Sequence, residues 1–477
     1  MQRIAAYPKV QVSADGRGVV SHVGARLVAN VAAAVGLPEA FDVAAGHARQ
    51  RRSAHAPSRV LTDLAVLLAD GGETISDLAA LRHQPGLFGC VASTATAWRV
   101  LDRIGPAGLD ALKQARAVAR ERAWLLRAEA GRLVPTLTCA GVAVPGLVID
   151  LDASLVTCHS EKEQAAATFK HGFGYHPLLA WLDNTDEALA AMLRPGNAGS
   201  NTAADHIQVT DEAIAQIPDA NRHGTPILLR SDGAGATKQW LNHLRGLRDQ
   251  HGLQVSFSVG FTVTNQVMEA IAILPCSAWT VAVDTAGEPR RTDDTGLPVA
   301  SVAELTGLLP GLTDAGWPEG MRVLVRRERP HPGAQISLME AHDGWRYQCV
   351  ATDTPTGQLA FLEARHRAHA HVEDRVKTVK QTGMGRFPSR EFAINAAWLQ
   401  LAITAADLIA FTQTILLHGA LAKAEPKKLR YRLLHTAARI DHGQRRTKIK
   451  LDAGWPWAVP LAAAFTRLAE IQPPLRV

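Results

Sequence analysis

Two aspartates set into an apolar run have the residue type and spacing to do chemistry. Asp150 and Asp152 lie within residues 147–154, among leucine, valine and isoleucine. In a strand, alternate side chains share a face, so both carboxylates would lie on one side of it. Burying two unpaired like charges is costly. The run therefore predicts either a metal or catalytic site, or a strand end whose aspartates cap a turn before Ser154.

A third acidic side chain, Asp232, follows a later apolar run. Residues 226–230 predict a strand, and the Ser-Asp-Gly of residues 231–233 comes at its carboxyl end. Mixed sheets flanked by helices place functional groups at the carboxyl ends of their strands. Asp232 is therefore a candidate to meet the pair on the earlier strand.

A fourth carboxylate lies on a stretch with helical periodicity, residues 366–380. Its valines fall in one stripe, which predicts a buried face. An adjacent stripe holds the polar residues His366, His369, Glu373, Lys377 and Lys380. Glu373 and Lys377 could simply form a surface ion pair at i,i+4 spacing. A structural zinc site is disfavoured, because no cysteine or second histidine cluster lies nearby.

Strands and helices alternate between residues 147 and 259 in an order that would position these carboxylates. Strands are expected at 147–155, 177–182, 188–193, 226–230 and 253–259, with helices at 201–217 and 237–251. Three strands, a helix, a strand, a helix and a strand is the order of a ribonuclease H-like α/β fold. In that fold Asp152, Asp232 and Glu373 would converge. Carboxylate oxygens at one point favour Mg²⁺, and two such ions can act on a phosphodiester.

The flanking regions have other patterns. Residues 21–130 predict short helices; the one at 94–104 carries Arg99 and Arg103 in a helix-turn-helix outline, which indicates a DNA contact. A β-rich insertion is expected at about 271–362, with strands at 279–283, 321–325 and 336–339, the last paired with 345–349. Residues 392–422 predict a core helix rather than a membrane span, because polar residues interrupt the run.

Charge is unevenly distributed along the 477 residues. The net charge is +6, yet residues 423–450 hold ten Lys or Arg and two acids, +8 in all, which leaves −2 for the rest. Such a local excess predicts a polyanionic partner. The five cysteines form no C-x-x-C pair, which is typical of a reduced, cytoplasmic protein. The first residues do not have the pattern of a secretory signal.

Several motifs together resemble DDE transposases of bacterial insertion sequences. The matching stretches are residues 150–154, 193–197, 229–233 and 367–377, with 77–82 near the N-terminus and 429–434 near the C-terminus. The group that the chain resembles most is the thirteen-eighty insertion-sequence group, a relative of piggyBac whose catalytic fold is split by a β-strand insertion. The spacings of 80 residues from Asp152 to Asp232 and 141 from Asp232 to Glu373 agree with such an insertion.

The resemblance implies a transposase that binds terminal inverted repeats, cleaves DNA and joins 3′-OH ends to a target, as in cut-and-paste transposition. Asp152, Asp232 and Glu373 would be catalytic and would bind Mg²⁺, with Mn²⁺ able to substitute. Asp150 stays open as a further or alternative metal ligand. The expected partners are DNA and a second copy of the chain, in bacterial cytoplasm at the nucleoid, with no membrane. The alternatives are a ribonuclease H-like nuclease without strand transfer and a domesticated DNA-binding protein.

The resemblance also assigns DNA-contacting cations. The family pattern has tyrosine and arginine where this sequence has His366 and His369, so charge there would depend on pH. The full expected set is His366, His369, Lys377, Lys380, Arg194, Arg99, Arg103, Lys427, Lys428, Arg430, Arg432, Arg445 and Arg446. In relatives with the insertion a tryptophan receives a flipped base, and the candidates here are Trp279, Trp317 and Trp345.

Five regions are expected along the chain. They are a helical N-terminal region for DNA binding or dimerisation at 1–132, the first part of the ribonuclease H-like core at 133–270, the β-rich insertion at 271–361, the catalytic-helix part of the core at 362–420, and a basic C-terminal region at 421–477.

Overall fold

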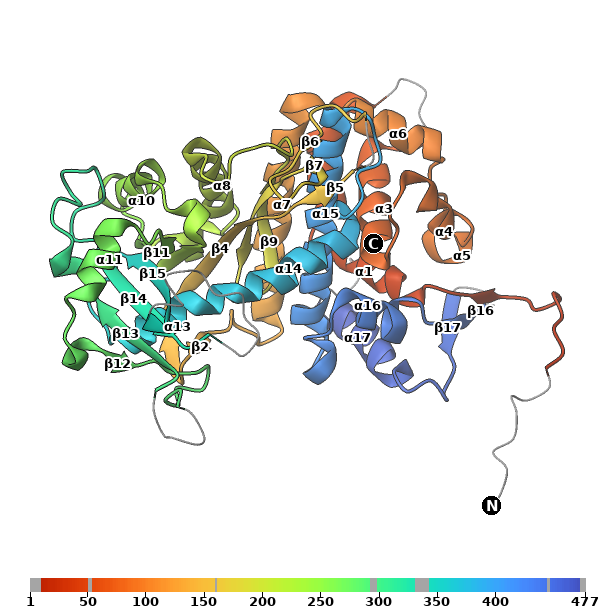
Figure 1. The fold of residues 1–477 in the computed structure, drawn as a ribbon. Coiled ribbons are helices and arrows are strands. Elements are labelled where there is room, and N and C mark those ends of the chain that lie inside the picture. The colour runs from red at the N-terminus through yellow and green to blue at the C-terminus, as the bar shows by residue number, and fades with distance from the viewer. Residues whose placement is uncertain are drawn as a thin grey trace, which may run out of the picture.

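A nine-stranded mixed sheet runs through the computed structural model (Figure 1). The structure describes residues 10–49, 54–158, 161–291, 298–330, 343–443 and 447–471. The strands follow the order β12-β13-β14-β15-β11-β10-β4-β8-β9 across the sheet. Their bounds are β4 Leu147–Ala153, β8 Leu178–Leu182, β9 Glu187–Met192, β10 Ile227–Ser231, β11 Val255–Phe261, β12 Thr280–Val281, β13 Ala300–Glu304, β14 Arg322–Glu328 and β15 Arg346–Thr352.

The strand β4 occupies the middle of this order. It is parallel to β10, which is parallel to β11, and it is antiparallel to β8, which is antiparallel to β9. Ile149 and Leu151 pack on one face and Val148 on the other, and all three are buried, as a strand covered on both sides requires. All five strands expected between residues 147 and 259 are present.

Helices cover both faces of the sheet (Figure 1). On one face α8 and α10 form a cluster with Ile149, in which Trp240 is fully buried. On the other face α14 places Val376 in the same cluster as Trp181 of β8. The elements on and around the sheet are α8 Ala203–Ala215, α9 Asp219–Arg222, η3 Gly233–Gly235, α10 Lys238–His251, α11 Asn265–Ala272, η4 Cys276–Ala278, η5 Thr306–Leu308, α13 Leu359–Arg367, η6 Ala368–His371, α14 Val372–Val379 and η7 Lys380–Met384.

The β-rich region expected at 271–361 continues the central sheet. Its strand β15 pairs antiparallel with β11, and β14, β13 and β12 follow outward. The strand expected at 336–339 lies outside the described residues, and the described partners of β15 are β14 and β11. Shorter strands form two small sheets: β2 Leu137–Cys139 with β3 Val142–Val144, and β5 Val156–Thr157 with β6 Ala166–Ala167 and β7 Phe173–Tyr175.

The N-terminal helices share one core with the C-terminal half. One hydrophobic cluster contains Leu64 of α3, Trp398 of α15, Val376 of α14 and Leu433 near the C-terminus. The N-terminal elements are α1 Val23–Ala34, α2 Leu37–Ala45, η1 Gly46–Ala48, α3 Pro57–Asp70, η2 Ile75–Leu78, α4 Ala79–Arg82, α5 Pro85–Phe88, α6 Thr94–Asp102 and α7 Gly105–Glu129. Four of the five expected regions, all but 271–361, contribute to this cluster.

The long helix α7 buries one face against the rest of the protein. Arg120 is fully buried and donates hydrogen bonds to Glu187 at 2.7 Å and to Asp407 at 2.5 Å. Arg116 donates to the same Asp407 carboxylate at 2.8 Å, and the carboxylate also accepts the amide of Ala188. Burying these charges is tolerated because each is paired and hydrogen-bonded. The network joins α7, α15 and the edge strand β9.

The segment Phe392–Leu416 is apolar and long enough to cross a membrane, but 83% of its most hydrophobic window is buried inside the protein. It contains α15, Phe392–Phe411, and the turn η8, Thr412–Leu416. Because α3, α7 and β9 pack around α15, it is a core helix, as the sequence predicts.

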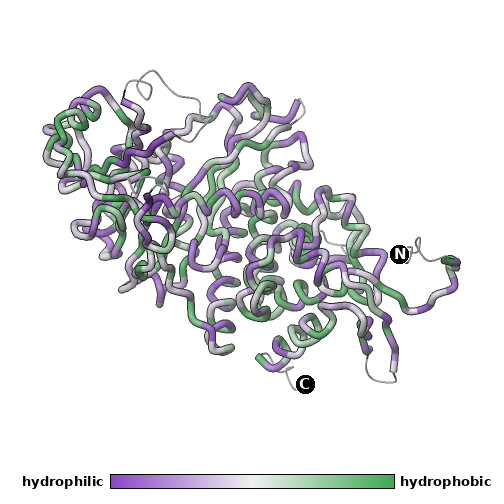
Figure 2. The backbone as a smooth tube through the Cα atoms, turned by 60° about the horizontal axis from the view of Figure 1, so that its bottom comes forward, coloured by the Kyte–Doolittle hydropathy of each residue, from purple (hydrophilic) through white to green (hydrophobic). Residues whose placement is uncertain are grey.

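The C-terminal region ends in a small sheet and a helix. The strands β16 and β17 form a hairpin to which β1 adds a third strand, at the edge of the molecule away from the central sheet (Figure 1). Hydrophobic and hydrophilic stretches alternate along the chain (Figure 2); in β16 buried and exposed residues alternate at first, whereas β17 is almost entirely exposed. The bounds are β1 Val19–Val20, η9 Gly419–Leu421, α16 Pro426–Leu429, η10 Arg430–Leu434, β16 Ala438–His442, β17 Thr447–Leu451 and α17 Ala458–Ile471.

Candidate active site

Two aspartates reach the same edge of the sheet from adjacent parallel strands. Asp152 is the second-to-last residue of β4, and Asp232 is the first residue after β10. The register pairs Leu151 with Ser231, so the two aspartates follow side by side. Asp232 then begins the turn η3, and its Oδ1 accepts a hydrogen bond from Ala234 N at 2.9 Å.

Glu373 brings a third carboxylate from α14, which packs against β4. Val372 and Val376 are buried on the side of α14 that faces the core, whereas Glu373 in the first turn is exposed. The helical phase that buries the valine stripe therefore leaves this carboxylate free of ion pairing with the core.

The three carboxylates share one electrostatic environment. The pKa of Asp152 is raised to about 6, first by burial and then by the negative charges of Asp232 and Glu373, against a lowering effect of His369. Such repulsion requires the groups to be near one another. The structure thus brings together Asp152, Asp232 and Glu373. A cation would relieve their repulsion.

The three carboxylates are less tightly gathered than the ligands of a single ion. Among the residues that the structure describes, the one group of three with ligand atoms all within 4.8 Å is His22, Asp70 and His435. Two ions about 4 Å apart distribute their ligands over both. As the side chains stand, the carboxylates of Asp152, Asp232 and Glu373 are not gathered within that distance.

Asp150 lies on the same strand but in a closed network of ion pairs. Its Oδ1 is 2.7 Å from Arg230 Nε and 2.9 Å from His369 Nδ1. Its Oδ2 is 2.8 Å from Arg230 Nη2 and 3.0 Å from Arg375 Nη1. Burial opposes ionisation, but Arg230 and His369 hold the pKa of Asp150 well below its usual range. Since both oxygens are occupied, this geometry favours Asp152 over Asp150 as the metal ligand.

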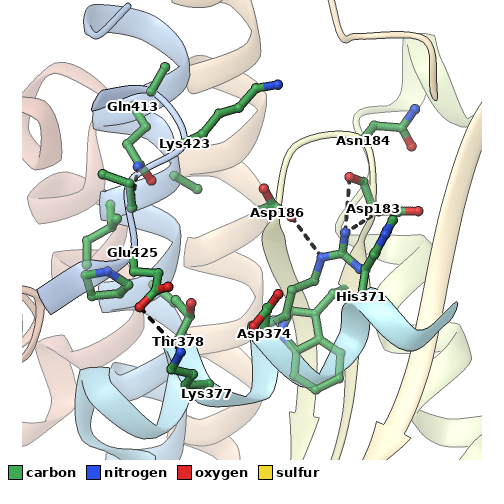
Figure 3. A pocket seen from close by; sticks show the side chains of 18 of the residues that line it. Asp183, Asn184, Asp186, His371, Asp374, Lys377, Thr378, Gln413, Lys423 and Glu425 are labelled. Carbon is green, nitrogen blue, oxygen red and sulfur yellow. Dashed lines mark hydrogen bonds and ion pairs between the residues drawn. The ribbon is translucent and has the colours of Figure 1, made fainter. Parts of the chain in front are cut away.

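Arg375 joins α14 to the turn between β8 and β9, where Asp183 and Asp186 lie (Figure 3). Besides Asp150, it contacts the Asp183 carboxylate and donates to Asp186 Oδ1 at 2.9 Å. Arg230 reaches the same Asp183 from the strand β10. Two arginines and two buried aspartates therefore set the position of α14 over β4.

Both histidines of the polar stripe are held by the protein. His366 Nδ1 lies 3.1 Å from Ser258 Oγ, and burial together with the charge of His369 lowers its pKa to about 3. His366 is therefore neutral near pH 7, and His369 is bound to Asp150. The resemblance implies that both histidines contact DNA. In this arrangement neither is a free cation for a phosphate.

The two lysines of the stripe have different surroundings. The pKa of Lys380 is lowered by burial and by Lys170, while Asp152 opposes the shift. Lys380 thus lies within electrostatic reach of the acidic site, together with Lys170. Lys377 is half-exposed, and its Nζ lies 3.4 Å from Glu425 Oε2 at a cavity of about 640 Å³ (Figure 3).

Two other acids near Glu373 in the sequence, Asp374 and Glu363, have different surroundings. Asp374 lines the cavity beside Lys377. Glu363 is buried and pairs with Arg367 at 2.9 Å and Arg326 at 3.4 Å.

Arg194 is a structural residue rather than an exposed DNA contact. It is buried, with Nε 2.9 Å from the carbonyl of His176 and Nη1 3.0 Å from Asp205. Two residues later the chain passes so close to a neighbouring strand that a Cβ on Gly196 would lie 2.3 Å from the carbonyl oxygen of Gly174. The motif therefore shapes the loop that leads into α8.

The remaining expected DNA contacts divide into exposed and buried residues. Arg430 is buried and donates to the carbonyls of Ala69 and Leu68 at the end of α3. Exposed members are Arg99, Arg103, Lys427 and Lys428. Arg432 lies over the ring of Trp457, 5.2 Å from its centroid. Arg445 and Arg446 lie outside the described residues.

The three tryptophans considered for a flipped base are partly buried and already in contact. Arg327 lies between Trp279 and Trp345, 4.0 Å and 4.7 Å from their ring centroids. Trp317 packs edge-on against Phe261. Each ring thus has a structural role in the outer part of the sheet.

Sequence reasoning did not single out several residues around the site. Arg230 and Arg375 lie inside the motifs that carry the resemblance, so motif position was a usable signal. Asp183 and Lys170 carried no such signal. The role of Asp183 as an ion-pair partner becomes clear only in the fold, where β8 pairs with β4 and Arg230 reaches the Asp183 carboxylate.

The fold and the site define a class of α/β protein in which carboxylates from two parallel strands and a helix meet at one sheet edge. The family model for the transposase DDE domain, group 1, matches residues 2–473, and the chain belongs to this family. The resemblance to DDE transposases is confirmed at that level, while the thirteen-eighty group stays a prediction. The cryo-EM structure of the piggyBac transposase synaptic complex with hairpin DNA matches 86% of this chain and 79% of that chain, at 8% identity and a TM-score of 0.41. No curated protein matches.

Proposed function

We propose that this transposase binds the terminal inverted repeats of an insertion sequence and catalyses Mg²⁺-dependent cleavage and strand transfer. The observation that carries the proposal is the parallel register of β4 and β10, which sets Asp152 beside Asp232, together with the packing of α14, which bears Glu373, against β4. These carboxylates come from β4, from the end of β10 and from α14. Positions so distant in sequence share an environment because the fold brings them to one edge of the sheet.

The strand arrangement supports a ribonuclease H-like core. Its five strands run in the order β9-β8-β4-β10-β11. The strand β8 is antiparallel to both of its neighbours, β9 and β4, whereas β10 and β11 are parallel to β4. The outer strands β12–β15 lie between β11 and the catalytic helix along the chain. They are thus the insertion that separates Glu373 from the two aspartates.

The donor set fits Mg²⁺, with Mn²⁺ as a substitute. Asp152, Asp232 and Glu373 offer only carboxylate oxygens, the ligands that hard divalent cations prefer. Burial, and then the charges of Asp232 and Glu373, raise the pKa of Asp152, so a bound cation would favour its ionised form. When bound, the ions would activate a water or 3′-hydroxyl and stabilise the leaving oxygen of a phosphodiester.

The protein's own cations would position the DNA backbone. Lys380 and Lys170 lie within electrostatic reach of each other, and Lys380 also of Asp152. Ammonium groups beside a metal site can hold the phosphates that flank the scissile bond. We expect these two lysines to orient the DNA strand toward Asp152 rather than to transfer protons.

Two further surfaces would contact the transposon ends. Arg99 and Arg103 are exposed on and directly after α6. In the C-terminal region, Lys427 and Lys428 are exposed beside Tyr431, whose side chain is 64% exposed. Cations interleaved with an aromatic ring suit a polyanion with stacked bases. Because two ends must be held together, we expect a homodimer on DNA, in the cytoplasm and at the nucleoid of a bacterium.

Substituting one aspartate tests the proposal. Asp232→Asn should leave binding to inverted-repeat DNA unchanged and reduce Mg²⁺-dependent nicking by about 10³-fold or more. Asp374→Asn is the matched control, because this acid lines the neighbouring cavity. Undiminished nicking by Asp232→Asn would refute the assignment.

Pre-cleaved ends distinguish a transposase from a nuclease that stops after cleavage. The wild-type chain should join 3′-OH ends to a supercoiled target plasmid in Mg²⁺ or Mn²⁺. Cleavage without any joined product, under conditions where the ends are bound, would favour the nuclease.

A further inference from the structure

Three metal-ligating side chains from distant parts of the chain meet outside the acidic site. His22 immediately precedes α1, Asp70 is the last residue of α3, and His435 follows η10. One ligand atom from each lies within 4.8 Å of the other two. In the part of the chain that the structure describes, no other three His, Cys, Asp or Glu residues gather this closely. The cluster lies where the N-terminal helices contact the C-terminal region.

The charge of Asp70 requires a positive partner. The residue is 4% exposed and lies at the C-terminus of α3, where the helix dipole disfavours an anion. The neighbouring Arg430 guanidinium is engaged by the carbonyls of Leu68, Ala69 and Gln381.

Hydrogen bonds alone leave one oxygen of this carboxylate without a partner. His22 Nδ1 lies 2.5 Å from Asp70 Oδ2. His435 Nε2 bonds the backbone carbonyl of Asp70 at 2.9 Å and is 3.4 Å from Oδ1. Asp70 Oδ1 is buried and accepts no hydrogen bond. Leaving a buried carboxylate oxygen unsatisfied is unfavourable, and this oxygen lies toward the His435 imidazole.

We propose that His22, Asp70 and His435 bind one transition-metal ion of the Zn²⁺ class. Two imidazole nitrogens and one carboxylate oxygen are the donors that Zn²⁺ accepts, whereas Mg²⁺ prefers oxygen ligands alone. The ion replaces the proton between His22 and Asp70 and supplies the missing partner of Oδ1. The side chain of His435 is 43% exposed and borders a cavity of about 600 Å³, so water can complete the coordination.

The site would be structural, because it joins three separate segments. It fastens the start of α1 and the end of α3 to the residues that follow η10. It is independent of the proposed function, since none of its ligands belongs to the acidic site.

Metal analysis of the full-length, untagged protein tests the proposal. After treatment with EDTA, reloading with Zn²⁺ and gel filtration, the wild-type chain should retain about one ion per chain, measured by mass spectrometry of the metal. Co²⁺ in its place should give visible d–d absorption. His435→Gln removes an exposed ligand and should lower Zn²⁺ affinity at least tenfold, whereas His442→Gln, an exposed histidine of β16, should leave it unchanged.

Thermal unfolding separates loss of the ion from loss of the fold. Zn²⁺ should raise the midpoint of the wild type and of His442→Gln but not that of His435→Gln. Asp232→Asn should still retain the ion, which distinguishes this site from the acidic one. Wild-type protein that retains no ion after gel filtration, or His435→Gln that retains as much as the wild type, would overturn the proposal and leave a cluster held by protons alone.

Discussion

Asp150 and Asp152 lie two positions apart on one strand and face the same side, yet their surroundings have opposite effects. Asp150 is ionised because Arg230, Arg375 and His369 surround it. Asp152 has no ion pair among its described contacts, and its pKa is raised by burial and by two other carboxylates. One aspartate therefore stabilises the fold, and the other destabilises it until a cation binds.

Asparagine at each position should reveal this difference. At pH 7.5 without metal, Asp152→Asn should raise the free energy of unfolding by about 1–3 kcal/mol. The native pKa of about 6 exceeds the ordinary 3.8, so the native state holds the proton more tightly. Stability of the wild type thus falls as the pH rises from about 4 to about 6, and the advantage of the variant should vanish below pH 4.

The control for that measurement is Asp150→Asn in urea unfolding. It should cost about 3–5 kcal/mol, because it removes one of the two buried carboxylates that pair with Arg230 and Arg375 and leaves only Asp183. Mg²⁺ should stabilise the wild type but not Asp152→Asn. A lower stability of Asp152→Asn at pH 7.5 would contradict the assignment of this residue to a charged metal site.

Local sequence patterns sufficed for some residues and not for others. The valine stripe of α14 and the acids of β4 follow periodicity, which needs no knowledge of the fold. Arg194 and Arg430 were predicted to contact DNA, yet both are buried, although a charged residue in a motif is expected to be exposed. Each guanidinium donates to backbone carbonyls of other segments, and such partners are visible only in three dimensions.

At the scale of elements, the position of α14 depends on the guanidinium group of Arg375. Arg375 bonds Asp150, Asp183 and Asp186 at once, which a lysine cannot do. The position of Glu373 at the sheet edge follows from this attachment. Gly383 then ends the segment at φ +116°, against Leu68 and Trp398.

Arg375→Lys should therefore damage catalysis more than DNA binding. We expect the free energy of unfolding to fall by about 2–4 kcal/mol, and the cleavage rate to fall while the affinity for the ends changes little. Arg390→Lys is the matched control, because the Arg390 side chain is 83% exposed. Equal effects of both substitutions on cleavage would refute the positioning role.

The elements themselves were largely predictable. The strands β4, β8, β9, β10 and β11 are apolar runs bounded by polar turns, so their types and order were correct. The strand β13 was missed because Ala300–Glu304 is short and mixes small, apolar and charged residues. The burial of Arg120 on one face of α7 could not be predicted locally, since its partner Asp407 follows it by 287 residues.

At the scale of the whole molecule, the exposed cations of the C-terminal region should contribute to DNA affinity through counterion release. The double variant Lys427→Ala, Lys428→Ala should weaken binding and lower the slope of log Kd against log salt by about 0.9 for each phosphate that the protein no longer neutralises. Fluorescence anisotropy with end DNA between low and moderate salt measures both.

Arg122→Ala is the control for the salt titration. This arginine is 40% exposed on α7, and its partner Glu129 lies on the same helix. It should leave the slope unchanged. A slope that is equally unchanged in the lysine variant would place the DNA on another face.

The hydrophobic cluster that joins Leu64, Val376, Trp398 and Leu433 has a practical consequence for anyone dissecting this protein. Fragments that begin or end at residue 132 or 421 would each contain only part of this hydrophobic cluster. They would expose its apolar side chains to water. Deletion mapping would then report misfolding and aggregation, whichever segment reads the transposon ends. Point substitutions on the exposed faces are the sound way to find that segment.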